Sequence, residues 1–148
     1  MNPRLNYTQS SPETLDTMMQ LEHYARSRGI DKSLYDLIKI RASQINGCAF
    51  CIDMHAKDLQ AMGESIDRIL LLSVWREVPI YTDKEKAVLE LTEYVTRISE
   101  SGLPDDVYER VRAHVDEKEF MDLIMTINTI NCWNRIAIST RMYPGCFL

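Results

Sequence analysis

The stretch LIKIRASQINGCAFCIDMH, residues 37–55, contains the end of one predicted helix, a chain reversal and the start of a second helix. Asn46-Gly47 is a typical helix stop, because glycine adopts the left-handed conformation of a helix C-terminus at no steric cost. No alternating, strand-like pattern precedes Cys48. We therefore predict that a new helix begins near Cys48 and that the two helices fold back on each other.

The same signals recur on both sides of this stretch and predict an all-helical chain. The five glycines and five prolines mostly lie between segments of helical periodicity. Ser10 with Glu13 and Thr82 with Glu85 match the capping-box pattern, and Asp31 and Asp116 are suitable N-caps. We expect about seven helices, at positions 10–28, 31–45, 48–63, 65–77, 82–102, 104–115 and 116–138.

Two local expectations accompany this prediction. The last helix is apolar on several faces and should be the central one, with Met18, Met19, Met121 and Met125 as ordinary core residues. Residues 69–74 are aliphatic enough that a short strand there stays possible, and residues 141–148 should be irregular.

Length and charge indicate the class of protein. A chain of 148 residues corresponds to one domain, residues 1–148. Lysine and arginine number 17 against 22 acidic residues, a net charge of −5 with no basic block, which argues against nucleic-acid or anionic-membrane binding. The longest apolar runs are far shorter than the roughly 18 residues of a membrane span. The polar start, Met1 to Arg4, argues against export, so we expect a reducing cytoplasmic location.

Two of the four cysteines form a CxxC motif, Cys48-Ala49-Phe50-Cys51, at the start of a predicted helix. A helix N-terminus favours the thiolate form, because unpaired N–H groups and the helix dipole stabilise negative charge there. His55 follows Cys51 by four residues and so shares its helix face. The motif thus places a base beside a thiol.

Several kinds of site could use these residues. Structural zinc would need a fourth ligand besides Cys48, Cys51 and His55, and no second motif supplies one. Covalent haem attachment needs a histidine where Ile52 stands. Small buried apolar cysteines are common, but that reading explains neither the pairing nor His55. Thiol–disulfide redox chemistry fits best, although no strand precedes the motif as it does in thioredoxin.

Residues 37–55 closely resemble the core motif of the AhpD-like branch of the carboxymuconolactone decarboxylase superfamily, in which a Glu precedes CxxC and then His. A looser resemblance includes residues 75–77, 83–92 and 131–135. It implies an all-helical subunit, a trimeric or hexameric homo-oligomer and thiol-dependent reduction of peroxides. The decarboxylase activity in the superfamily's name belongs to members without the cysteine pair, so we do not expect it here.

The resemblance also implies roles for individual residues. Cys51 would be the peroxidatic thiol, Cys48 the more accessible resolving thiol, and His55 part of the relay that takes the proton from Cys51. The family's Glu falls at Asp36, which keeps the carboxylate with a shorter reach. Glu77 and Glu85 are reserve candidates for that carboxylate.

The residues themselves support Asp36 only in part. If the helices around Asn46-Gly47 are antiparallel, Asp36 lies within a turn of His55 and could orient the imidazole. Asp36 could equally be a solvated acid in the first turn of its helix.

The remaining histidines, cysteines and polar residues have simpler interpretations. We expect His23 and His114 on the surface, Cys132 as a buried filler and Cys146 as a tail residue. The polar line Asn128, Asn131 and Arg135 should anchor a helix end or a subunit contact.

The sequence therefore predicts a dithiol-dependent peroxidase or disulfide reductase. Its substrate would be a peroxide, and its reductant a dithiol, either a thioredoxin-like protein or a lipoyl-type group. No metal, haem, flavin or nucleotide cofactor is expected. The alternative is a noncatalytic redox sensor or interaction protein that uses the same Cys48–Cys51 disulfide.

Overall fold

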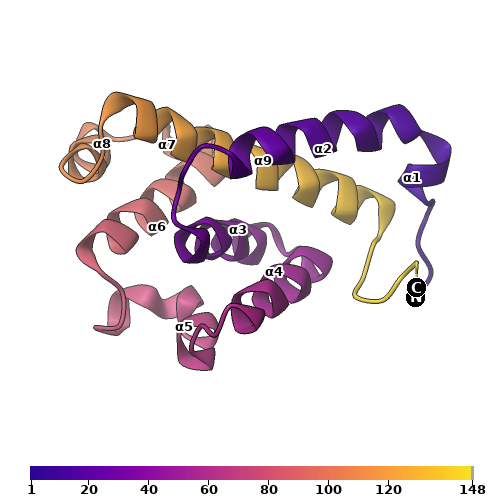
Figure 1. Ribbon diagram of the computed structural model, residues 1–148, viewed down its shortest axis with the longest axis horizontal. Helices are drawn as coiled ribbons and strands as arrows, with labels where there is room; N and C mark the ends of the chain where they lie inside the picture. The colour runs from indigo at the N-terminus through magenta and orange to yellow at the C-terminus, as the bar shows by residue number, and fades with distance from the viewer. Residues whose placement is uncertain (148) are drawn as a thin grey trace.

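The protein is all-helical over residues 1–147, the part of the chain that the computed structural model describes (Figure 1). Residues 69–74, where a strand was possible, lie instead in helical segments and a turn. Nine α-helices and one 3-10 helix occur in this part of the chain, where seven helices were expected. They are α1 (Tyr7–Ser10), α2 (Pro12–Arg26), α3 (Lys32–Asn46), α4 (Ala49–Ala61), α5 (Ile66–Leu70), η1 (Leu72–Glu77), α6 (Asp83–Thr96), α7 (Ile98–Ser101), α8 (Asp105–Arg112) and α9 (Glu117–Thr140).

The additional helices arise at three local interruptions. The Ser10–Glu13 capping box was wrong: a separate short helix, α1, ends at Ser10, and α2 begins with Pro12. The helix expected over 65–77 is divided into α5 and η1, and Val74 inside η1 has non-helical angles (φ −120°, ψ 30°). The helix expected over 82–102 is interrupted at Arg97 (φ −106°, ψ 38°), so that α7 is separate from α6.

The most enclosed helix is α3, not the last helix as expected from sequence. Residues 34–40 are all buried, because α3 is packed between α4, α6 and α9. Helix α9 has an exposed side, on which Met121 is 55% exposed. Met19 is also largely exposed, so the prediction that both methionines are core residues was wrong, whereas Met18 is buried.

The reversal between α3 and α4 has the predicted form. Gly47 caps α3 in the left-handed conformation (φ 75°, ψ 35°), where a side chain would be strained. Asn46 donates hydrogen bonds to Asn131 (3.0 Å) and Asn134 (2.9 Å) of α9, and Asn134 donates to Ser43 (2.9 Å). These four residues, called the amide cluster below, fix the end of α3 to the middle of α9.

The N-terminal arm lies beside the C-terminal end of α9 (Figure 1). The backbone N–H of Arg4 donates to the carbonyl of Thr140 (2.8 Å), which pairs the N-terminal arm with α9. Tyr7 of α1 then packs edge-to-face on Trp133, with ring centroids 6.3 Å apart. Among the helices of residues 1–147, none has a stretch long and apolar enough to cross a membrane.

Candidate active site

The two cysteines of the CxxC motif are joined by a disulfide at the start of α4. Cys48 is the N-cap of this helix, and its sulfur accepts a hydrogen bond from the backbone N–H of Cys51 (3.4 Å). Both residues are 2% exposed, so Cys48 is not the more accessible of the two in this oxidised subunit. Only Cys51 lines the neighbouring cavity.

His55 lies one turn after Cys51 and is 1% exposed. Its Nδ1 is 3.1 Å from Oδ1 of Asp36, which is buried, and 3.7 Å from Oδ2 of Asp58, whose side chain is half exposed. An ionised carboxylate can only accept, so the Asp36 contact places the proton on Nδ1. Nε2 then has a free lone pair, and it has no hydrogen-bond partner among residues 1–147.

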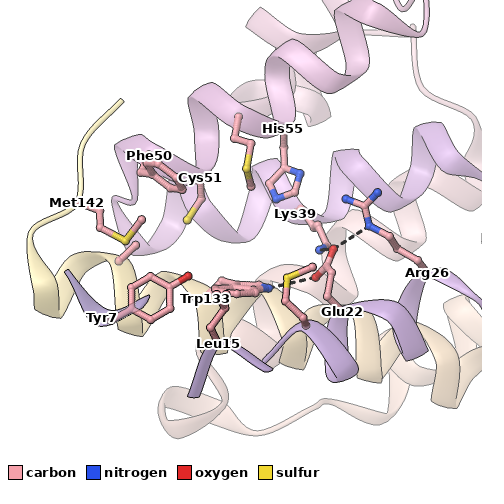
Figure 2. Close-up of a pocket in the computed structure, with 13 residues that line it drawn as sticks. Tyr7, Leu15, Glu22, Arg26, Lys39, Phe50, Cys51, His55, Trp133 and Met142 are labelled. Carbon is pink, nitrogen blue, oxygen red and sulfur yellow. Dashed lines mark hydrogen bonds and ion pairs between the residues drawn. The ribbon is translucent and has the colours of Figure 1, made fainter. Parts of the chain in front are cut away.

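A cavity of about 270 Å³ lies beside Cys51 and His55. Its walls come from α1, α2, α3, α4, α9 and the segment after α9, and most of them are apolar (Figure 2). The apolar and aromatic side chains that line it are Tyr7, Leu15, Met19, Phe50, Met54, Trp133, Ala137 and Met142. A substrate in this cavity would meet the Cys51 sulfur in surroundings that exclude most water.

Glu22 lies at the centre of a charged group in the same cavity, and no sequence pattern drew attention to it. The carboxylate accepts from Lys39, which is fully buried, and from the Tyr35 hydroxyl (3.0 Å), Arg26 Nε (3.0 Å) and Trp133 Nε1 (3.2 Å). Burial alone would raise the pKa of Glu22. The charge of Lys39 and hydrogen bonds from Lys39, Arg26 and Tyr35 outweigh burial and hold this pKa at about 2.

Burial has the opposite effect on the other partner of this pair. It lowers the pKa of Lys39, while the adjacent Glu22 carboxylate opposes that change. The pair stays charged because each ion supplies the hydrogen bonds that the other lost with its water. Sequence alone could not reveal the group, since its members come from α2, α3 and α9.

The reserve carboxylates lie elsewhere. Glu77 is exposed in η1, and Glu85 completes the predicted capping box with Thr82 and pairs with Arg68 (2.6 Å). Neither residue lines the cavity beside Cys51. Asp36 is thus the one of the three that the structure places at His55.

The other residues considered from sequence have simpler positions. His23 and His114 are exposed, as expected. Cys132 is half-buried and Cys146 is buried, the reverse of the expected order. Of the expected polar line, only Asn131 anchors a helix end, together with Asn134, because Asn128 and Arg135 are exposed.

Asp36, His55 and Asp58 are the one group of metal-ligand side chains in residues 1–147 with donor atoms mutually within 4.8 Å. A metal ion there would have to displace the His55 Nδ1 proton that the Asp36 carboxylate accepts. The hydrogen-bonded arrangement instead suits an imidazole that takes protons at Nε2. Chemically, the site combines a dithiol/disulfide, a base oriented by a carboxylate, and an apolar cavity.

Comparison with known proteins assigns the chain to a family. Residues 12–94 match the carboxymuconolactone decarboxylase family. The uncharacterized protein YdfG of Bacillus subtilis is 48% identical over 139 residues, 94% of this chain and 95% of YdfG.

Two further matches point to one branch of that family. The crystal structure of ATU0492 from Agrobacterium tumefaciens, a protein of unknown function named as a candidate antioxidant defence protein AhpD, has a TM-score of 0.94 and 46% identity, covering 97% of this chain and 99% of that one. The alkyl hydroperoxide reductase AhpD of Bradyrhizobium diazoefficiens is 44% identical over 41 residues, 28% of this chain and 22% of that protein. The chain therefore belongs to the carboxymuconolactone decarboxylase family, as an AhpD-like member.

Proposed function

We propose that this chain, acting as a single unit over residues 1–148, is a thiol-dependent peroxidase of the AhpD type. The observation that supports this most directly is the position of His55. Its Nδ1 contacts the buried Asp36, and its unpartnered Nε2 belongs to a side chain that lines the same cavity as Cys51. A base that is oriented on one side and free on the other is what thiol activation requires.

In the first step, His55 Nε2 takes the proton of the Cys51 thiol, and Asp36 stabilises the resulting imidazolium. The Cys51 thiolate attacks the outer oxygen of a hydroperoxide ROOH, and the O–O bond breaks. Cys51 becomes a sulfenic acid, and the RO⁻ that leaves takes the proton from His55 and departs as the alcohol ROH.

In the second step, the Cys48 sulfur attacks the Cys51 sulfur. The sulfenic hydroxyl leaves with the Cys48 proton as water, and the disulfide forms. The peroxide is thereby reduced by two electrons, and the two thiols are oxidised by two electrons. Because Cys48 lies one turn away on the same helix, the resolution is intramolecular and fast compared with a second encounter.

A dithiol donor then returns the enzyme to its reduced form. One donor thiolate attacks the disulfide, the second donor thiol resolves the mixed disulfide, and the donor leaves as its own disulfide. A thioredoxin-like protein or a lipoyl group would serve, and no metal, haem, flavin or nucleotide takes part in this scheme. The cycle requires a compartment that keeps donor thiols reduced, and for this reason we propose a cytoplasmic location.

The alternative function is a redox sensor in which the same disulfide changes assembly state without turnover. Turnover number separates the two: an enzyme consumes many equivalents of peroxide per subunit when a dithiol is supplied, whereas a sensor consumes about one. The buried His55–Asp36 pair favours the enzyme, since a sensor does not need an oriented base.

Trapping of intermediates tests the assignment of the two thiols. In Cys48→Ser, peroxide should accumulate a sulfenic acid on Cys51, detected by a dimedone adduct and peptide mass mapping. Cys51→Ser should yield no adduct on Cys48. Cys132→Ser serves as the matched control, because that thiol is free, and it should turn over like the wild type. Adducts on Cys48 would show that the roles are reversed, and adducts on neither would exclude the mechanism.

A further inference from the structure

The cavity beside Cys51 is elongated along α2. The α2 residues that line it are Leu15, Met19, Glu22 and Arg26, spaced by four, three and four positions on one side of the helix. At 1.5 Å per residue, the eleven positions from first to last span roughly 16 Å. A cavity of this shape suits a chain-like ligand better than a small round one such as hydrogen peroxide.

The two ends of this cavity differ in polarity (Figure 2). Tyr7, Leu15 and Met142 form one end, which is apolar. Glu22 and Arg26 form the other end, which is charged, and Cys51 lies between the two. A ligand that fills the whole length therefore meets hydrocarbon at one end, the reactive sulfur along its length, and charge at the other end.

The charged end has a positive excess. Glu22 contributes one negative charge, while Lys39 and Arg26, which both bond to it, contribute two positive charges. Lys39 is fully buried and its ammonium is directed at Glu22. The Arg26 side chain is 56% exposed and bonds to Glu22 through Nε. The two terminal nitrogens of its guanidinium are therefore free to meet solvent at this end of the cavity.

The surroundings of Arg26 include both signs of charge. A second cavity on its other side is lined by Lys32, Asp36 and Asp58. Both of these carboxylates lie next to His55 Nδ1, and Lys32 supplies a further cation beside Arg26. A guanidinium can bind a carboxylate in a bidentate, charge-assisted manner that a lysine cannot reproduce.

We propose that the substrate is an amphipathic hydroperoxide with a carboxylate head, of the fatty-acid hydroperoxide class, and that Arg26 selects it by binding the carboxylate. The hydrocarbon end then lies among Tyr7, Leu15 and Met142, and the hydroperoxide on the chain lies at Cys51. This inference rests on the proposed peroxidase function, because it names the substrate of that reaction.

The test compares three hydroperoxides with the wild-type protein and a dithiol donor: linoleic acid hydroperoxide, its methyl ester and cumene hydroperoxide. The acid should be preferred over the ester by about tenfold in kcat/KM, the order of a charge-assisted hydrogen bond. Arg26→Gln should abolish this preference, because kcat/KM for the acid should fall to about the value for the ester. Arg26→Lys keeps the positive charge but not the bidentate geometry of the guanidinium, so it should retain part of the preference for the acid.

Lys57→Gln is the matched control, since Lys57 is an exposed cation of α4 that does not line the cavity, and it should keep the full preference. Equal kcat/KM for acid and ester in the wild type, or an undiminished preference in Arg26→Gln, overturns the inference while leaving the peroxidase function intact. Absence of cumene hydroperoxide turnover instead overturns the peroxidase function.

A binding measurement without turnover tests the role of Arg26 independently of the peroxidase function. Calorimetry with laurate, a fatty acid without a peroxide group, should show binding that is about tenfold weaker in Arg26→Gln. Laurate binding that Arg26→Gln does not weaken would contradict the carboxylate assignment, whatever the result with peroxides.

Discussion

At the scale of single residues, His55 separates two different environments. Nδ1 lies next to Asp36 and the half-exposed Asp58, whereas Nε2 has no hydrogen-bond partner among residues 1–147, and the side chain lines the apolar cavity. Cys51 lines the same cavity as His55. In the proposed mechanism, Nε2 accepts the thiol proton, and the carboxylate at Nδ1 stabilises the charge that results.

This arrangement predicts an order of severity for substitutions. Peroxide-driven oxidation of Cys51, followed by stopped flow, should be abolished in Cys51→Ser and slowed at least tenfold in His55→Gln, because general-base assistance contributes about 10²- to 10⁴-fold. Asp36→Asn should have a smaller effect, and Asp36→Glu should remain active as it keeps the carboxylate. His23→Gln, an exposed histidine, is the control. Wild-type rates in His55→Gln would exclude it as the base.

The sequence predicted which residues form the site only where they are close together in sequence. Cys48, Cys51 and His55 lie within two turns of one helix, so their proximity follows from helical geometry alone. Asp36 needed an assumption about how α3 and α4 pack, and the structure agrees with that assumption. Glu22 stayed undetected, because an acid in a polar helix has no distinctive pattern and its partners are distant in sequence.

At the scale of elements, the amide cluster determines where α4 begins. Asn46, Asn131, Asn134 and Ser43 join the end of α3 to α9 directly before the disulfide. Asn134 and Ser43 are fully buried, and the hydrogen bond between them is costly to lose because no water replaces it. The cluster therefore holds the turn that precedes Cys48 against α9.

Removing one member tests this. Asn134→Ala should lower the free energy of unfolding by about 2 kcal/mol, because it removes the partner of the buried Ser43 hydroxyl and one of the two acceptors of the Asn46 amide. Asn128→Ala, an exposed asparagine of the same helix, should change it by less than about 0.5 kcal/mol. Urea denaturation of both variants measures the difference. Equal stability of the two would mean that the cluster is not a significant anchor.

Helix ends could be predicted from the sequence where a single capping residue determines them. Asp31, Thr82 with Glu85, Asp116 and Gly47 all cap as expected, since a cap depends only on neighbours in sequence. The breaks at Val74 and Arg97 were not predictable, because apolar residues continue at helical spacing across both of them.

At the scale of the whole molecule, stability should fall in acid. Glu22 has a pKa of about 2 when folded against an ordinary value of 4.5, and bonds from Trp75, Arg76 and Arg41 outweigh burial to lower the pKa of Glu93. A lowered pKa contributes stability above the unfolded value, and that contribution is lost as pH falls through the folded value. The loss should therefore begin below about pH 4.5.

Urea denaturation at pH 7, 4.5 and 3 measures this effect. Glu22 alone should account for a decrease on the order of 2 kcal/mol as pH falls through this range toward its folded pKa. Glu22→Gln removes the titrating group, so it should be less stable at pH 7 but lose less between pH 4.5 and 3. A variant with the same pH dependence as the wild type would show that Glu22 is not responsible.

The assembly state is a separate prediction for the whole molecule. The family resemblance implies a closed homo-oligomer, and the isolated chain exposes several large aliphatic side chains, including Ile66 and Leu70 (66% exposed). Closed symmetry avoids open-ended growth. Light scattering at micromolar concentration should give the mass of a trimer or a hexamer, and the mass of one chain would exclude this.

Trp133 makes the protein its own fluorescent probe. It packs against the cluster of buried residues that contains both cysteines, whereas Trp75, the second tryptophan, lies in a different cluster. Disulfides quench indole emission at close range, so in Trp75→Phe the emission of Trp133 should rise when the disulfide is reduced and fall when peroxide restores it. Each half of the catalytic cycle could then be timed separately, in real time and without a label.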